Sequence, residues 1–270
     1  VQDNFCRMTN VNWEIKGLDI EAFLGARTLI INDFLALSYA LPLLDVSKDG
    51  CVKPLLLPNG TIPSPSGSIR AVIGAGTGLG VGFLVEDHGK YLAIPSEGGH
   101  VEWAAGSREF YDLYDFIQQT EGMLPEAEHV ISGPGIGRIF RYLQGNASKH
   151  ALSLPTESPP TNPKELPAWV ASNSATEPLC NKAMELFVKA YARFACNIAL
   201  TFLPTAGLYL AGGIAAKNAT LFEADHLFTR TFLTACRESH RKLLESIPLY
   251  IITDYSVSLL GAAHAAYSLL

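Results

Sequence analysis

The stretch GAGTGLG at residues 74–80, with glycine at every second position, constrains this chain more than any other. Apolar segments of strand composition lie on both sides of it, at 69–75 and 81–85, so we expect a strand-to-strand turn. The four glycines lack a Cβ, so the backbone there can adopt positive φ and its N–H groups can close around an anion without side chains in the way. Thr77 adds a hydroxyl that can donate to a phosphate oxygen. The turn is therefore a candidate phosphate site.

The residues after this turn distinguish it from two common phosphate-binding loops. A P-loop continues with Lys-Ser/Thr and a dinucleotide fingerprint opens a helix, but here a second strand follows. A turn at 86–90 leads to a third apolar strand at 91–94, which we expect to end at Pro95. The sequence Glu-Gly-Gly-His at 97–100 comes next, and its two glycines allow one tight loop to present a carboxylate and an imidazole. Each motif alone is compatible with an ordinary hairpin or a solvated loop, whereas the pair favours a binding site.

Together, GAGTGLG at 74–80 and PSEGGHVEW at 95–103 closely resemble the hexokinase-type glucokinases of the bacterial kind. Members of that family are ATP-dependent glucose kinases of the actin/hexokinase fold. The resemblance implies that the glycine turn binds nucleotide phosphate and that the Glu-Gly-Gly-His loop binds the sugar. The residues that it assigns to the nucleotide are Gly76, Thr77 and Gly78, and those that it assigns to the sugar are Glu97 and His100.

The pair Asn32-Asp33 lies where a strand is expected to end and a helix to begin. Residues 28–31 have the composition of a short buried strand, and apolar side chains at helical spacing follow from Phe34. Open α/β sheets bind ligands at the carboxyl ends of their strands, so this position favours a site. The alternative is that one of the two residues only caps the helix. The sequence INDF resembles the glucokinase pattern, which implies that both residues bind the sugar and that Asp33 is the general base.

Glu128 precedes a segment, 130–132, that we expect to form a short strand ending at Gly-Pro-Gly. In the family a glutamate at this place binds the sugar, and the resemblance assigns that role to Glu128. Glu126 and His129 match no family residue. Without the resemblance, Glu128 would be interpreted as an exposed acid in a loop.

Gly212 and Gly213 lie between an expected strand at 208–211 and the start of a helix. Such a turn allows a flat ring or a phosphate to approach the backbone closely. The resemblance implies that these glycines pack against the adenosine of the nucleotide, whereas a simple tight turn is the alternative.

The other elements follow from hydrophobic spacing and from the positions of glycine and proline. The expected helices cover 21–27, 110–117 with an end at Gly122, 181 to near Pro204, and 256 onward, and the expected last strand covers 249–252. Residues 49–68 and 145–178 are rich in turn formers, so we expect exposed connections there without core elements.

The alternation of strands and helices predicts an α/β protein of two lobes. The resemblance implies that these lobes have the actin/hexokinase-like fold, which is related to that of ribonuclease H. We assign residues 1–43 and 254–270 to a small lobe, and 44–253 to a large lobe with a proline-rich excursion at 145–178. The family's N-terminal phosphate loop, Asp-x-Gly-Gly-Thr, does not occur in this sequence. We therefore expect a small lobe that is incomplete at its N-terminal side.

The bulk composition argues against several other classes of protein. A hydrophobic content of 48% and a charged content of 17% are typical of a densely folded chain. The net charge of −6, without a basic run, argues against binding to nucleic acid or to a membrane. The 5 cysteines are scattered and form no Cys-x-x-Cys pair, which indicates free thiols and no metal site made by the protein. We expect a cytoplasmic homodimer.

The predicted function is ATP-dependent phosphorylation of glucose at its 6-hydroxyl, with ATP and Mg²⁺ as cofactors. Two alternatives stay open. One is a non-catalytic sugar-binding regulator, or pseudokinase, which the missing Asp-x-Gly-Gly-Thr sequence favours. The other is a kinase for another hexose, such as mannose or an amino sugar.

Overall fold

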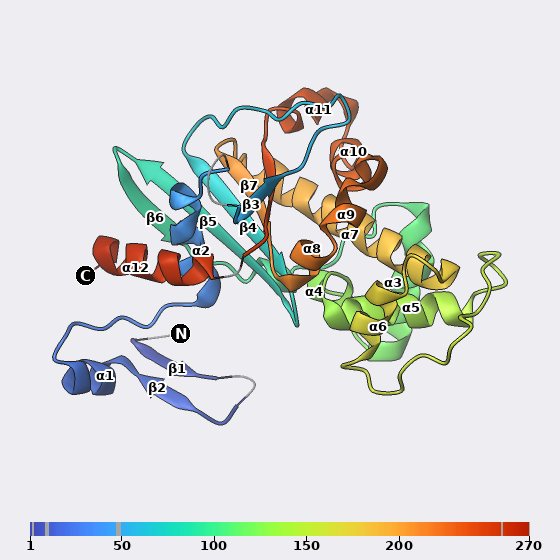
Figure 1. Ribbon diagram of the computed structural model, residues 1–270, viewed down its shortest axis with the longest axis horizontal. Helices are drawn as coiled ribbons and strands as arrows, with labels where there is room; N and C mark the ends of the chain where they lie inside the picture. Colours follow the sequence, from blue (N-terminus) through green and yellow to red (C-terminus); the bar gives the residue numbers. More distant parts are fainter. Residues whose placement is uncertain (2, 9–10, 47–49, 255, 270) are drawn as a thin grey trace.

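The computed structural model describes residues 1, 3–8, 11–46, 50–254 and 256–269 (Figure 1). The positions outside the described residues are 2, 9–10, 47–49, 255 and 270. They fall within the segments assigned to the two expected lobes. The N-terminal elements lie beside a larger main body, and the C-terminal helix lies at the lower left of that body in the view of Figure 1.

A mixed β-sheet forms the centre of the main body (Figure 1). Its strands are β3 Val52–Pro54, β4 Ile69–Ala75, β5 Leu79–Asp87, β6 Lys90–Ile94, β7 Gly207–Ala211 and β8 Leu249–Ile252. Among the described residues the strand order is β3-β8-β7-β4-β5-β6. The strands β8, β7 and β4 are parallel, whereas β5, β6 and β3 pair antiparallel with their neighbours. The strands predicted on both sides of the glycine turn, before Pro95, and at 208–211 and 249–252 are thereby confirmed.

Helices cover both faces of this sheet. On one face, α7 (Pro178–Phe202) and α10 (Leu227–Thr234) share the largest hydrophobic cluster with Ile73 of β4. On the other face, α2 (Asp33–Ala40) and α12 (Val257–Leu269) pack against each other. Val72, the residue next to Ile73, belongs to the cluster on the α2 side, as the alternation of side chains along a strand requires. The sheet is therefore buried on both sides, which fixes the register of β4 and β5.

Further helices extend the main body at one end of the sheet (Figure 1). They are α3 Arg108–Glu121, α4 Ala127–Val130, α5 Gly133–Gly145 and α6 Leu166–Ser172. The predicted helix at 110–117 lies within α3, and Gly122 ends it with a φ of 73°, as expected for a glycine C-cap. The long helix expected from 181 to near Pro204 is α7. The smaller helical elements are η1 Leu41–Leu43, η2 Gly98–His100, α8 Gly213–Lys217, α9 Ala219–Glu223, η3 Ala224–His226 and α11 Glu238–Leu244.

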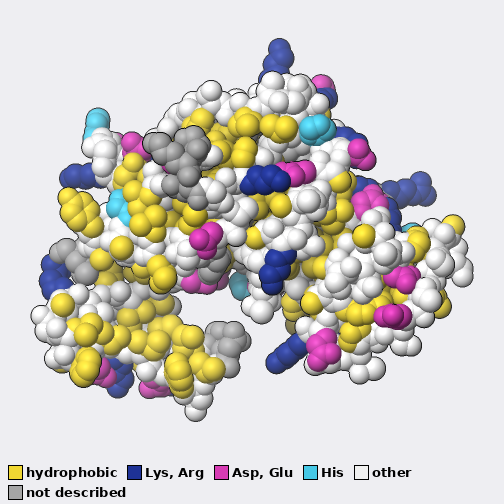
Figure 2. All heavy atoms as spheres, viewed as in Figure 1, with side chains coloured by type: hydrophobic (Ala, Val, Ile, Leu, Met, Phe, Trp, Pro, Cys, Tyr) yellow, Lys and Arg dark blue, Asp and Glu magenta, His cyan; other side chains and the backbone are white. Residues whose placement is uncertain are grey.

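The N-terminal elements differ from the prediction. A small hairpin of β1 (Phe5–Arg7) and β2 (Glu14–Lys16) leads into α1 (Gly17–Leu24), which begins before the expected helix at 21–27. The strand expected at 28–31 is wrong, because the side-chain amide of Asn4 binds the backbone there. Asn4 donates to the carbonyl of Thr28 and accepts from the N–H of Ile30, both at 2.8 Å. Figure 2 shows hydrophobic side chains gathered on this part of the molecule.

Three other expectations are corrected by the structure. The strand expected at 130–132 is absent from this described stretch, where α4 ends at Val130 and Ser132 caps α5. The connection at 49–68 contains β3. The excursion at 145–178 contains α6, whose Leu166 and Val170 are buried in the core. Proline-rich segments can therefore still contribute to a core through one short helix.

No helix within the described part of the chain is both long and apolar enough to cross a membrane.

Candidate functional site

A cavity of about 390 Å³ lies where five separate segments of the chain meet. The segments are 32–34, 74–81, 96–97, 128 and 212–213. They bring together the start of α2, the turn between β4 and β5, the loop after β6, α4 and the turn after β7.

Most of the site residues predicted from the sequence line this one cavity. They are Asn32, Asp33, Gly76, Thr77, Gly78, Glu97, Glu128, Gly212 and Gly213. Among the residues described, His100 belongs to the same loop as Glu97 but lies outside the cavity lining. The structure therefore places three carboxylates and the glycine turn around one hollow, while their roles toward a ligand remain predictions.

Asn32 and Asp33 form the start of α2. Oδ1 of Asn32 accepts hydrogen bonds from the backbone N–H of Phe34 at 2.8 Å and of Leu35 at 3.3 Å, so Asn32 is the N-cap of the helix. Because Oδ1 is used in this way, the side-chain NH₂ is the group that Asn32 can offer to a ligand. Oδ1 of Asp33 also accepts from the N–H of Phe34, at 3.0 Å, and the side chain is exposed. The capping interpretation and the ligand interpretation are thus compatible.

The turn between β4 and β5 is held by a hydrogen bond from the N–H of Gly76 to the carbonyl of Gly78, at 2.8 Å. Glycine permits positive φ here, but none of the glycines of the described turn adopts it. Space explains three of the glycines: a Cβ on Gly74 or on Gly80 would lie 2.5 Å or 2.1 Å from the ring of Phe34, and one on Gly78 would lie 2.5 Å from Oε2 of Glu128. The missing side chains thus allow close approach by neighbouring groups, whereas Gly76 has no heavy atom within 4 Å of its Cβ position.

Glu128 is tied to the turn by its side chain. Its Oε2 accepts a hydrogen bond of 2.8 Å from the backbone N–H of Leu79, the first residue of β5. The hydroxyl of Ser132 donates to the backbone carbonyl of Glu128 at 2.7 Å and accepts from the N–H of Gly135. Ser132 thus links Glu128 to the start of α5. The half-buried Glu128 is therefore held at its carboxylate by Leu79 and at its backbone carbonyl by Ser132.

The loop after β6 forms the short helical turn η2. A Cβ on Gly99 would lie 1.9 Å from the carbonyl oxygen of Leu79, so this glycine is required for the loop to pack against β5. Glu97 is exposed and lines the cavity. The ring of His100 is hydrogen-bonded through Nδ1 to Oε2 of Glu126 at 2.7 Å. This hydrogen bond raises the pKa of His100 above its ordinary value, although burial acts in the opposite direction.

Sequence reasoning missed the role of Glu126. It precedes α4 as its N-cap and forms a capping box with His129, whose Nδ1 accepts from the backbone N–H of Glu126 at 2.9 Å. The usual capping box has Ser or Thr at the N-cap and Glu or Gln three residues later, which Glu126 and His129 do not match. The sequence therefore contains no clear signal for this cap or for the partner His100.

Gly212 and Gly213 lie at the end of β7, next to the glycine turn. Gly212 has a φ of 89°, and a Cβ on it would lie 2.3 Å from the carbonyl oxygen of Ala75. Here glycine is required both for the backbone conformation and for the close approach of the chain. Gly213 begins α8 and is exposed toward the cavity.

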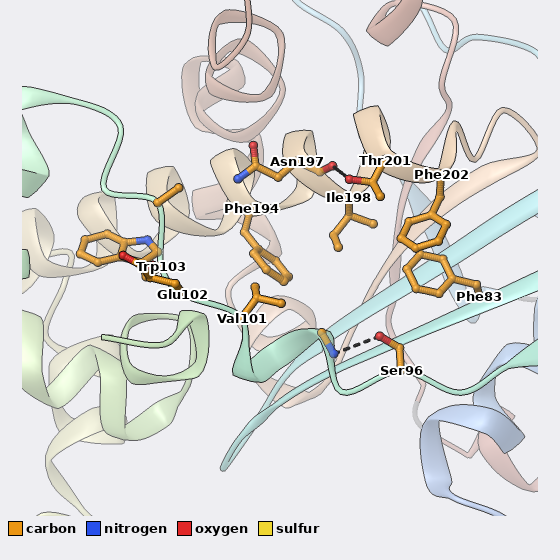
Figure 3. A pocket seen from close by; sticks show the side chains of 12 residues that line it. Phe83, Ser96, Val101, Glu102, Trp103, Phe194, Asn197, Ile198, Thr201 and Phe202 are labelled. Atoms are coloured by element: carbon orange, nitrogen blue, oxygen red, sulfur yellow. Dashed lines mark hydrogen bonds between the residues drawn. The ribbon is translucent and has the colours of Figure 1, made fainter. Parts of the chain in front are cut away.

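A second, more apolar cavity of about 270 Å³ lies on the other side of the Glu97 loop (Figure 3). In Figure 3 the side chains of Phe194 and Ile198 of α7 point toward Val101, and Phe202 faces Phe83. Ser96 lines both cavities, and its hydroxyl accepts from the N–H of Gly98 at 3.0 Å. The loop that carries Glu97 therefore has the carboxylate-lined cavity on one side and this more apolar cavity on the other.

Comparisons with known proteins agree with one another. A family model described as Glucokinase matches residues 1–269. The glucokinase of Yersinia enterocolitica is 34% identical over 265 residues, which cover 97% of this chain and 75% of that protein. The crystal structure of glucokinase from Balamuthia mandrillaris in complex with glucose is 23% identical, with a TM-score of 0.78 over 99% of this chain and 75% of that one.

A more distant structure, a ROK family glucokinase from Streptomyces griseus in complex with glucose and AMPPNP, is 16% identical. Its TM-score is 0.55, and the similarity covers 94% of this chain and 73% of that one. These likenesses confirm the predicted α/β, actin/hexokinase-like fold.

Proposed function

Because this chain belongs to the glucokinase family, we propose that it transfers the γ-phosphoryl group of ATP to the 6-hydroxyl of glucose, with Asp33 as the general base. One observation carries this proposal more than any other. Asp33, Glu97 and Glu128, far apart in the sequence, line the same cavity as the glycine turn.

The polar groups of the cavity suit a sugar. Glucose offers hydroxyls that donate and accept, and the carboxylates of Asp33, Glu97 and Glu128 accept, while the side-chain NH₂ of Asn32 donates. A sugar that lacks one hydroxyl would leave one of these groups unpaired, which allows strong discrimination. His100 lies at the edge of this set, and we propose that its imidazole donates to a sugar hydroxyl from there.

The glycine turn suits the phosphates of the nucleotide. The hydroxyl of Thr77 and the backbone N–H groups near Gly78 are donors at the cavity wall, and Gly212 and Gly213 offer a bare backbone surface for the adenosine. Mg²⁺ enters as part of the MgATP substrate, because in such sites it is held largely by phosphate oxygens. Its charge would offset the repulsion between the phosphates and the three carboxylates.

The reaction then needs alignment and one proton acceptor. The 6-oxygen of the sugar forms a bond to the γ-phosphorus as the bond to the bridging oxygen of ADP breaks. Asp33 accepts the proton of the 6-hydroxyl, for which its Oδ2 is suited because Oδ1 is bonded to the N–H of Phe34. The cavity is lined both by 32–33 of the expected small lobe and by residues of the expected large lobe. We propose that these lobes close on the sugar and exclude water.

The test is a turnover assay with the purified full-length protein, glucose and MgATP, in which ³¹P and ¹³C NMR identify the product. The expected product is glucose 6-phosphate, with a higher kcat/KM for glucose than for mannose or glucosamine. Calorimetric binding of glucose without binding of AMPPNP, and no turnover, would instead support the sugar-binding regulator. A higher kcat/KM for another hexose would move the assignment to that sugar. The homodimer remains a prediction that sedimentation of the same protein tests.

A further inference from the structure

We propose that Glu128 couples sugar binding to nucleotide binding by holding the glycine turn in place, which rests on the proposed function of the cavity. Its two carboxylate oxygens have different surroundings. Oε2 accepts from the N–H of Leu79 at 2.8 Å, whereas Oε1 lies farther from the turn, 3.8 Å from the Cβ position of Gly78 against 2.5 Å for Oε2. One oxygen therefore holds the protein backbone, and we infer that the other, on a side chain that lines the cavity, accepts from a sugar hydroxyl.

The segment that carries Glu128 holds the turn at two points. At one side, Oε2 of Glu128 is bonded to Leu79; at the other, the N–H of Gly133 donates to the carbonyl of Gly76 at 2.7 Å. Gly78, between them, has no side chain that would displace the carboxylate. The turn is thus bracketed by the stretch 128–133, and the position of its N–H groups depends on where that stretch lies.

Glu97 provides a contrast within the same cavity. It carries the same carboxylate and lines the same hollow, but it belongs to the loop after β6 and is exposed. From that loop, Gly98 lies close to Val81 of β5 and Gly99 lies close to the carbonyl of Leu79. Both carboxylates line the cavity in which we propose that sugar binds. Glu128 is the one whose carboxylate accepts from the N–H of Leu79 at the turn.

The energetic consequence follows from linkage. A sugar hydroxyl bound to Oε1 fixes the carboxylate, so the bond from Oε2 to Leu79 is formed for a larger fraction of time and the turn is ordered for phosphate. The sugar then strengthens nucleotide binding, and the nucleotide strengthens sugar binding by the same factor. Typical couplings of this kind are about 5- to 150-fold.

Calorimetry on the full-length protein tests this with AMPPNP titrated in the absence and in the presence of saturating glucose. The readout is the ratio of the two Kd values, which cancels any general loss of nucleotide affinity. We expect a ratio of about fivefold or more for the wild type and for Glu97→Ala at saturating glucose, and less than about twofold for Glu128→Ala. Glu128→Gln keeps an acceptor for Leu79 but replaces the second oxygen by an NH₂ group that cannot accept from a sugar hydroxyl, so its ratio should also fall below that of the wild type.

The outcomes separate this inference from the function on which it rests. A wild-type protein that binds neither glucose nor AMPPNP would contradict the proposed function. Binding of both without coupling, or coupling that survives in folded Glu128→Ala, would overturn the inference alone. Should Glu128→Ala not fold, amide exchange of the wild type decides: glucose alone must slow exchange of the Leu79 N–H, and unchanged exchange there would overturn the inference.

Discussion

The ring of Phe34 occupies the space in which a side chain at position 80 would lie: its Cε2 is 2.1 Å from the Cβ position of Gly80. The same ring lies 2.5 Å from the Cβ position of Gly74, the residue paired with Gly80 across the hairpin. Phe34 follows Asp33 directly, so the helix that presents the proposed base rests on the strands that present the proposed phosphate turn.

Gly80→Ala is expected to push the Phe34 ring away and to move the start of α2. Overpacking of this kind costs about 1–3 kcal/mol in the free energy of unfolding, which urea unfolding measures. Glucose affinity should fall as well, because Asn32 and Asp33 move with Phe34. The matched control is Gly76→Ala, whose Cβ position has no heavy atom within 4 Å. Equal stability of the two variants would contradict the packing argument.

Asn32 allows the capping role and the ligand role to be separated. Asn32→Asp keeps a cap oxygen but replaces the NH₂ donor by an acceptor, so we expect stability within about 0.5 kcal/mol of the wild type and glucose affinity at least about tenfold lower. Asn32→Ala should lose about 1 kcal/mol of stability as well. Urea unfolding and calorimetry measure the two quantities. Unchanged glucose affinity in Asn32→Asp would leave Asn32 as a cap alone.

The pair of His100 and Glu126 predicts a pH dependence. The pKa of His100 is raised in the folded protein by its hydrogen bond to Glu126, so the stabilisation is fully present below the unfolded value of about 6.5 and is lost as pH rises through the folded value. The pair is partly exposed, so its contribution is at most about 1 kcal/mol. An NMR titration should show a lower pKa for His100 in Glu126→Gln. The same midpoint in both proteins would contradict the assignment.

The sequence predicted the central strands because several signals agree there. Residues 69–75 are mostly apolar and run into the glycines of the turn, and β6 ends before Pro95, which cannot donate a ladder hydrogen bond. The helix α3 shows apolar side chains at helical spacing up to a glycine C-cap. Where the local pattern and the packing agree in this way, the sequence is sufficient to predict the secondary-structure element.

The errors arise where tertiary contacts decide. Residues 28–31 have strand composition, but their backbone groups bind the side chain of Asn4, far away in sequence. The segment 130–132 is too short for its periodicity to distinguish helix from strand. Gly74, Gly78 and Gly80 make room for Phe34 and Glu128, which no local signal around these glycines reveals. The candidate residues themselves came from the motifs, and their convergence on one cavity required the structure.

The most direct test of the central claim is the turnover of Asp33→Asn, with glucose affinity measured in parallel by calorimetry. Asparagine keeps the shape of the side chain and an oxygen for the N–H of Phe34 but cannot accept the proton of the 6-hydroxyl. We expect kcat to fall at least about 100-fold while the Kd for glucose changes much less. A folded Asp33→Asn protein that binds glucose and MgATP and turns over at the wild-type rate would contradict the account.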